Sequence, residues 1–179
     1  MIAGFTGHSA PDDLRRLIAE FDLGGVIYFS RNIADPAQIV IVDAKQPTQI
    51  ARVFTMPAAG PHGLDLDAEQ HRLFCACDAK QLVTLDTASG TVLNVSDLSG
   101  IPDVIFFNAA LRRLYVAIGD PGVIDVFDTE SLQRIEIVST EKGAHTIGFD
   151  ASRSKVFAFP RVDAAMTRPS RGISLRRRT

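Results

Sequence analysis

The stretch Arg113-Leu-Tyr-Val-Ala117, followed by Val123-Ile-Asp-Val-Phe-Asp-Thr129, decides the fold of this chain. Each segment is a short apolar run rich in β-branched and aromatic residues, and the Gly-Asp-Pro-Gly sequence between them favours a turn. An upstream segment, Gln81-Leu-Val-Thr-Leu-Asp86, has the same character. The sequence therefore predicts strands that are joined in antiparallel pairs by tight turns.

The pattern repeats at a fixed distance along the chain. When Asp67, Asn108 and Asp150 are aligned, the steps between them are 41 and 42 residues. A period near forty, filled with short strands and without helical spacing, is typical of the blades of a β-propeller. The fuller copies span residues 61–100 and 102–140, and a further copy begins at residue 143. We therefore predict a mainly β fold, an incomplete β-propeller of about three four-stranded blades with one N-terminal α-helix.

Composition divides the chain into residues 1–37, a repeat region at 38–159, and a tail at 160–179. Pro11 and two acidic residues open a predicted helix over 12–21, and a short apolar strand follows at 26–29. The tail holds six Arg and one Asp, a net charge of +5 within a chain whose total is −2. Its Pro, Ser, Gly and Arg content predicts disorder.

With 46% apolar and 22% charged residues among 179, the chain has the composition of a globular protein with its own core. No apolar run approaches the length of a membrane span, and the N-terminus lacks the features of a secretory signal. The default expectation is therefore a cytoplasmic protein with no membrane partner. The basic tail is a candidate for nucleic-acid binding, but no aromatic or fold motif accompanies it, so a solvated tail is favoured.

The string Gly24-Gly-Val-Ile-Tyr-Phe-Ser-Arg-Asn-Ile33, followed by Asp35-Pro-Ala-Gln38, resembles the N-terminus of family 3 glycoside hydrolases, the β-N-acetylhexosaminidase-like enzymes. The resemblance covers about residues 1–40 and implies one unit of a TIM barrel. The family's Lys-His-Phe-Pro-Gly-His-Gly loop, its His/Asp acid–base pair and its aspartate nucleophile have no counterpart here. One βα unit of eight cannot close a barrel, so we predict a fragment without catalytic residues.

The strings Arg113–Ala117 and Val123–Thr129, together with Gly143-Ala-His-Thr-Ile-Gly-Phe-Asp150, resemble the YVTN-type, YncE-like β-propeller repeats. This resemblance covers about residues 38–159 and implies a propeller. At the junction of the two resemblances, Val26–Ser30 is predicted to stand beside Gln38–Asp43 in one sheet. Abrupt changes near residues 40 and 160 are also what a chimeric, truncated chain with a shifted end would show.

Three residues occupy the same repeat position, five residues before the aligned Asp or Asn: His62, Asp103 and His145. This position opens the innermost strand of a blade, which lines the central channel of a propeller. Imidazole and carboxylate groups together are suitable ligands for a metal such as zinc. The same three residues are also candidates for binding a small anion. The alternative, which we favour, is a set of polar caps at the channel mouth. No catalytic residue and no cofactor site is predicted.

Other polar and sulfur-bearing residues have structural interpretations. Cys75 and Cys77 lie two residues apart on a predicted strand, too close for an unstrained disulfide and too few for a zinc site, so they are expected to be buried thiols. Five aspartates are expected to accept backbone N–H bonds in turns, namely Asp65, Asp67, Asp86, Asp128 and Asp150.

The sequence thus predicts a non-catalytic binding or scaffold module of the β-propeller type, truncated in the sense that its repeats are too few for a ring, with an unknown ligand or protein as partner. Three and a half blades cannot close a ring, so the chain is expected to be either an open, marginally stable sheet stack or one half of a ring that a homodimer completes. The competing interpretations are a family 3 glycoside hydrolase fragment and, by analogy of fold, a lactonase-like propeller enzyme.

Overall fold

A computed structural model describes residues 2–4, 16, 25–27, 38–43, 46–150, 153 and 155–160. The chain divides into two compact units, Met1–Pro57 and Ala58–Thr179. In the described residues every regular element is a strand. The helix predicted over 12–21 lies outside them except for Arg16, which has helical conformation, and so does most of the predicted tail. No helix in the described ranges has the length and hydrophobicity to cross a membrane.

The first unit contains two small sheets. Its strands are β1 (Ile2–Gly4), β2 (Gly25–Ile27), β3 (Gln38–Asp43) and β4 (Gln46–Thr55). β1 pairs with β2 in parallel, whereas β3 and β4 form an antiparallel hairpin. The prediction that Val26 and its neighbours stand beside β3 is therefore wrong, because β2 finds its backbone partner in β1.

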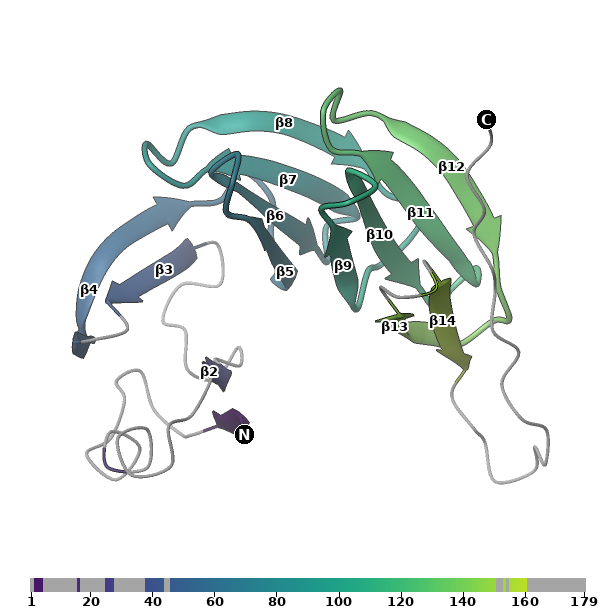
Figure 1. Ribbon diagram of the computed structural model, residues 1–179, viewed down its shortest axis with the longest axis horizontal. Coiled ribbons are helices and arrows are strands. Elements are labelled where there is room, and N and C mark those ends of the chain that lie inside the picture. Colours follow the sequence, from purple (N-terminus) through teal and green to yellow (C-terminus); the bar gives the residue numbers. More distant parts are fainter. Residues whose placement is uncertain are drawn as a thin grey trace. The chain divides into compact units, whose positions relative to one another are not determined.

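The second unit contains ten strands in three antiparallel sheets (Figure 1). The first sheet has the order β5 (Pro61–Asp67), β6 (Arg72–Cys77), β7 (Gln81–Asp86) and β8 (Val92–Asp97). The second has the order β9 (Ile105–Asn108), β10 (Arg113–Ile118), β11 (Val123–Asp128) and β12 (Arg134–Ser139). β13 (Ala144–Asp150) and β14 (Lys155–Pro160) form the third. Strand order follows chain order throughout, so each repeat of the sequence is one meandering sheet.

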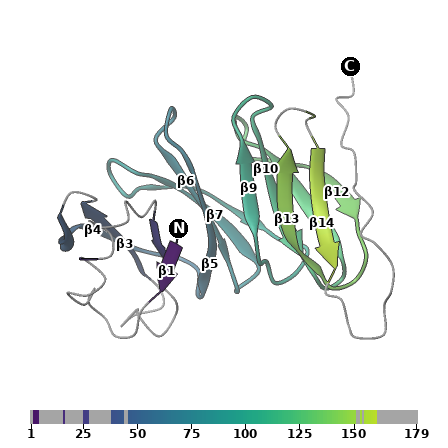
Figure 2. The same ribbon diagram turned by 60° about the horizontal axis from the view of Figure 1, so that its bottom comes forward.

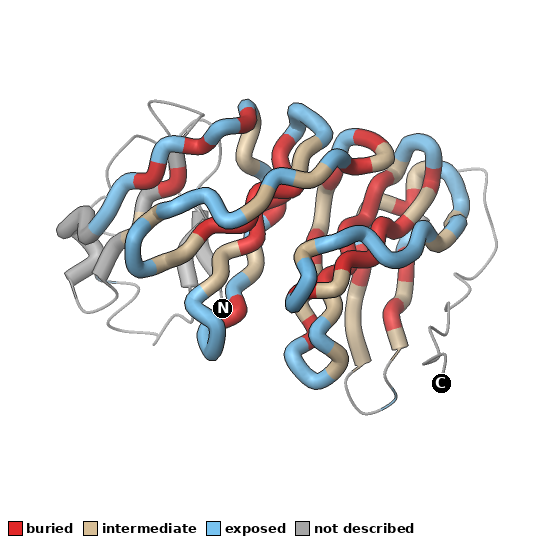
Figure 3. Tube along the Cα trace, turned by 90° about the horizontal axis from the view of Figure 1, so that it is seen from above, coloured by how far each residue is buried: buried red, intermediate tan, exposed pale blue. Residues whose placement is uncertain are grey.

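The central strands of the two four-stranded sheets are buried on both faces. In β6, β7, β10 and β11 four or five consecutive residues are buried, whereas the outer strands β8 and β12 are mostly exposed. Figure 3, viewed from the side of β8 and β12, shows exposed residues along these strands and buried ones beneath them. Continuous apolar runs are expected where sheets stack face to face, because both sides of the strand then meet another sheet.

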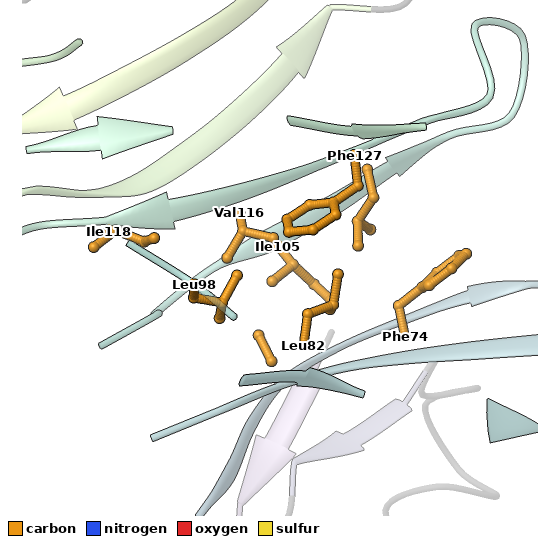
Figure 4. Packing of buried hydrophobic residues seen from close by; sticks show 9 residues of the cluster. Phe74, Leu82, Leu98, Ile105, Val116, Ile118 and Phe127 are labelled. Carbon is orange, nitrogen blue, oxygen red and sulfur yellow. The ribbon is translucent and has the colours of Figure 1, made fainter. Parts of the chain in front are cut away.

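Two apolar clusters hold the three sheets of the second unit together. The first joins the sheets β5–β8 and β9–β12 through Phe74, Leu82, Ile105, Val116 and Phe127, among others (Figure 4). The second joins β9–β12 to the hairpin β13–β14, which lies beside β9 and β10 in Figure 2. Burying one large apolar side chain in such a cluster contributes about 2–3 kcal/mol, so sheet stacking dominates the stability of this unit.

The turns confirm most of the predicted aspartate roles. The carboxylate of Asp67 accepts the backbone N–H groups of Glu69 and Gln70, and that of Asp150 accepts the N–H of Arg153. Asp65 differs from the prediction. Its Oδ1 accepts the neighbouring N–H of Leu66, and its Oδ2 accepts the N–H of Phe107 on the next sheet at 2.5 Å. Asp65 lies in the middle of β5, so its side chain reaches the adjacent strand β9 and not a turn.

Candidate functional site

The structure brings the three channel candidates together. His62 lies in β5, Asp103 lies two residues before β9, and His145 lies in β13, so each comes from a different repeat of the second unit. His62 Nε2 is 3.4 Å from one carboxylate oxygen of Asp103, and the other oxygen makes a short contact with His145 Nδ1. One carboxylate therefore bridges two imidazole rings, and the three side chains form a continuous row, here called the axial row.

His62 also has a second acidic partner. Its Nδ1 lies 2.9 Å from the carboxylate of Asp78, which follows β6. Neutral imidazole has one N–H, so only the imidazolium form of His62 donates to both carboxylates at once. The side chains of His62, Asp103 and His145 are 48%, 33% and 42% exposed, which leaves the axial row open to a dissolved ligand.

Backbone contacts between sheets position the axial row. The N–H of Asp103 donates to the carbonyl of Ala117 at 3.0 Å, and the N–H of Val104 donates to the carbonyl of His145 at 3.4 Å. Gly119 lies directly behind His145, because a Cβ added there would stand 3.0 Å from the His145 Cβ. The main chain of one sheet thus fixes where the side chains of the next one emerge.

The axial row is a chain of contacts between one carboxylate and two imidazole rings. Within the described residues, no group of three or more His, Cys, Asp or Glu side chains is arranged to hold a metal ion. Both oxygens of Asp103 face ring nitrogens, so the three groups contact one another and do not converge on a common point. His145 keeps one polar atom available, since its Nε2 has no hydrogen-bond partner in the described part of the chain.

Asp86 and Asp128 have the predicted turn role. Each carboxylate accepts two backbone N–H groups and one serine hydroxyl in the turn that follows its strand. The hydroxyl of Ser89, with the backbone N–H groups, lowers the pKa of Asp86. The backbone N–H of Ser131 is the main group that lowers the pKa of Asp128. These residues stabilise turns and lie outside the axial row.

Cys75 and Cys77 are buried free thiols, as predicted. Their sulfur atoms are 3.8 Å apart on the same face of β6. The hydrogen bond with Cys77 and the burial of the thiol both raise the pKa of Cys75. A thiol with a raised pKa carries little thiolate, so Cys75 is a poor nucleophile and a poor metal ligand.

Sequence reasoning missed Asp125, the fully buried carboxylate of β11. It accepts the backbone N–H of Ser99 at 2.8 Å and the Ser99 hydroxyl at 2.7 Å, and it pairs with Arg134 at 3.2 Å. Ser99 follows β8, so this cluster ties the first sheet to the second. The only signal in the sequence is an aspartate inside the apolar run Val123–Phe127.

A second feature lies at the opposite ends of the inner strands. A cavity of about 100 Å³ opens between the turns that follow β5 and β9, with Arg72, Arg112 and Glu130 in its wall. Arg112 pairs with Glu130, and Arg72 donates to the backbone carbonyl of Thr129. Both arginine side chains of this cavity thus have partners within the protein, and the axial row is the better candidate site for a ligand.

Comparison with known proteins gives a fold and no closer relationship. Neither a protein-family model nor a curated protein matches the chain. Among solved structures, hydrazine synthase from Kuenenia stuttgartiensis is 14% identical, with a TM-score of 0.65 over 72% of this chain and 37% of that one. Sqt1 from Saccharomyces cerevisiae is 12% identical, with a TM-score of 0.59 over 69% and 37%. AztD from Citrobacter koseri is 17% identical, with a TM-score of 0.50 over 59% and 30%.

These three neighbours have β-propeller-like folds, so the repeated four-stranded sheets of this chain belong to a β-propeller-like module. The chain spans about a third of the length of each neighbour, between 30% and 37%. At such low identity the likeness concerns the fold alone.

Proposed function

We propose that this chain is a non-catalytic β-propeller binding module whose ligand docks on the axial row. The observation that carries the proposal is the meeting of His62, Asp103 and His145, which come from equivalent positions of three successive repeats. The three side chains come from separate repeats and contact one another in a row, so the stacking of the repeats presents them together to a ligand.

The ligand we propose is a small anion or the anionic end of a larger partner. In its doubly protonated form, His145 offers the Nε2 N–H to such a ligand while its Nδ1 stays on Asp103, at a surface that is about half exposed. The acidic Asp78 and Asp103 hold the rings in place and keep the site from being strongly basic. We therefore expect weak, selective binding that depends on where the imidazole rings are held.

The repeat pattern supports the finer assignments. The strings in β10, β11 and β13 resemble YVTN-type repeats, and on this basis we assign about three blades to one chain. A closed propeller needs four to eight blades, so we propose that two copies form one ring. Residues 1–40 resemble a family 3 glycoside hydrolase fragment, and we propose that they contribute no catalysis, since the family's catalytic strings do not occur in the sequence.

The test is a calorimetric and thermal-shift titration of the full chain with inorganic phosphate, acetate and zinc. We expect phosphate or acetate to bind the wild-type protein, and His145→Ala to abolish that binding. His71→Asn is the matched control, because His71 is exposed in a turn with φ of 54°, a conformation that Asn tolerates. Equal binding by His145→Ala would refute the site, as would saturable turnover of a chromogenic N-acetylglucosaminide or a lactone that this substitution removes.

A further inference from the structure

Two of the two-stranded sheets are complementary parts of the repeated four-stranded one. In the aligned repeats, β13 and β14 correspond to the first and second strands of the four-stranded sheets, which are β5 and β6 in one sheet and β9 and β10 in the other. The hairpin β3–β4 corresponds to the third and fourth strands, since Gln38–Asp43 is aligned with Gln81–Asp86 and with Val123–Asp128. Together, one hairpin of each kind makes a complete sheet.

The contacts between neighbouring sheets repeat with the sequence. Phe74 in β6 packs against Phe107 in β9 with ring centroids 5.5 Å apart. One repeat later, Tyr115 in β10 stacks on Phe149 in β13 at 6.4 Å. A further step of the same register pairs Phe157 of β14 with the position of Leu66 in β5.

The side chains at that next position are exposed on the sheets of the second unit. Leu64 and Leu66 are 50% and 49% exposed, although Ile105 and Ile147, the repeat equivalents of Leu64, are each only 7% exposed. Phe159 on β14 is 45% exposed. Both flanks of the sheet stack in the second unit therefore present apolar side chains at positions where the repeat elsewhere supplies a neighbouring sheet.

From this complementarity we propose that a second copy of the chain covers both flanks, with β13–β14 of one copy and β3–β4 of the other forming a shared blade. This inference rests on the proposed ring of two copies and specifies how it closes. The twelve strands β3–β14 of each copy give six four-stranded blades per dimer. Closure within one chain would give three blades, below the four that a closed ring needs.

The shared blade also completes the axial row. In the register of the repeat, His145 of one copy is followed by the position of His62 in the partner, so the row continues across both interfaces. The imidazole rings of His145 and of the second copy's His62 then become neighbours, and that His62 keeps its contact with Asp78.

The test is crosslinking of the full chain through introduced cysteines. A mixture of Leu66→Cys and Phe157→Cys chains is treated with a short bismaleimide, and a mixture of Leu93→Cys and Phe157→Cys chains is the control. Leu93 is 45% exposed on the outer strand β8, away from the proposed interface. The native thiols Cys75 and Cys77 are buried and are present in every sample. We expect about tenfold more covalent dimer from the first mixture than from the control, because the interface raises the local thiol concentration.

A second pair of cysteine substitutions provides the same test in case one of the first variants does not fold. Leu64 and Phe159 are both about half exposed, so Leu64→Cys and Phe159→Cys chains should fold and crosslink in the same way. Light scattering of the wild-type chain should give twice its mass of 19.4 kDa. A folded monomer, or equal crosslinking of the control mixture, would overturn the shared blade. If crosslinking succeeds but phosphate and acetate do not bind, the proposed ligand site fails while the shared blade stands.

Discussion

Replacement of Asp125 by Ala removes the charged acceptor that ties two sheets together. Asp125 is 0% exposed, and its carboxylate accepts the N–H of Ser99 at 2.8 Å and the Ser99 hydroxyl at 2.7 Å. It also pairs with Arg134 at 3.2 Å. The substitution leaves all three donors without this acceptor and a small void in the middle of β11.

The size of the effect follows from these contacts. A buried donor without an acceptor costs about 1–3 kcal/mol, and the two donors of Ser99 are partly buried, so each is expected near the lower end of that range. Arg134 is 35% exposed, so its guanidinium can turn to water, and its share is the roughly 0–1 kcal/mol of an exposed pair. We therefore expect Asp125→Ala to lower the free energy of unfolding by about 3 kcal/mol, at the lower end of what breaking a buried ion pair costs.

Urea denaturation at neutral pH measures this loss. Asp125→Asn keeps one carbonyl acceptor and should lose about half as much, and Ser99→Ala should lose about 1 kcal/mol for one hydrogen bond. A double-mutant cycle between Asp125→Asn and Ser99→Ala isolates the coupling of the two side chains. A loss below about 0.5 kcal/mol for Asp125→Ala, with an unchanged denaturant slope, would refute the view that this cluster joins the sheets.

The remaining predictions concern a turn, the core and a tight glycine. Asp128→Ala should lower the free energy of unfolding by about 1 kcal/mol. Because the folded pKa of Asp128 lies below its unfolded value, this contribution is present above about pH 4 and is lost as the pH falls through the folded pKa. Urea melts of wild type and variant should therefore converge toward about pH 2. Phe127→Ala should cost about 3–5 kcal/mol because Phe127 is only 2% exposed, whereas the exposed Val92→Ala should change little; equal midpoints would contradict the packing. Gly100→Ala should cost about 1–3 kcal/mol, because a Cβ there would lie 2.3 Å from the carbonyl oxygen of Asp120; a thermal melt unchanged from wild type would show that the loop yields.

The candidate site shows which features the repeat pattern of the sequence predicts and which it does not. The spacing of 41 and 42 residues is enough to put His62, Asp103 and His145 at equivalent positions, and a repeat fold then places them at one end of successive sheets. The pattern says nothing of which atoms meet. That Asp103 bridges the two rings, and that Asp78 takes the other nitrogen of His62, depends on how the sheets stack and on the turn after β6.

The sequence by itself determined the strands, their antiparallel order and the turns, because these depend on neighbouring residues. Apolar runs, Gly and Pro breaks and aspartates such as Asp86 and Asp128 set them locally. It did not reveal the pairing of β2 with β1 or the reach of Asp65 to Phe107. Those features, like the cluster around Asp125, join residues far apart in the chain, and only the stacking of one sheet on the next brings such residues within bonding distance.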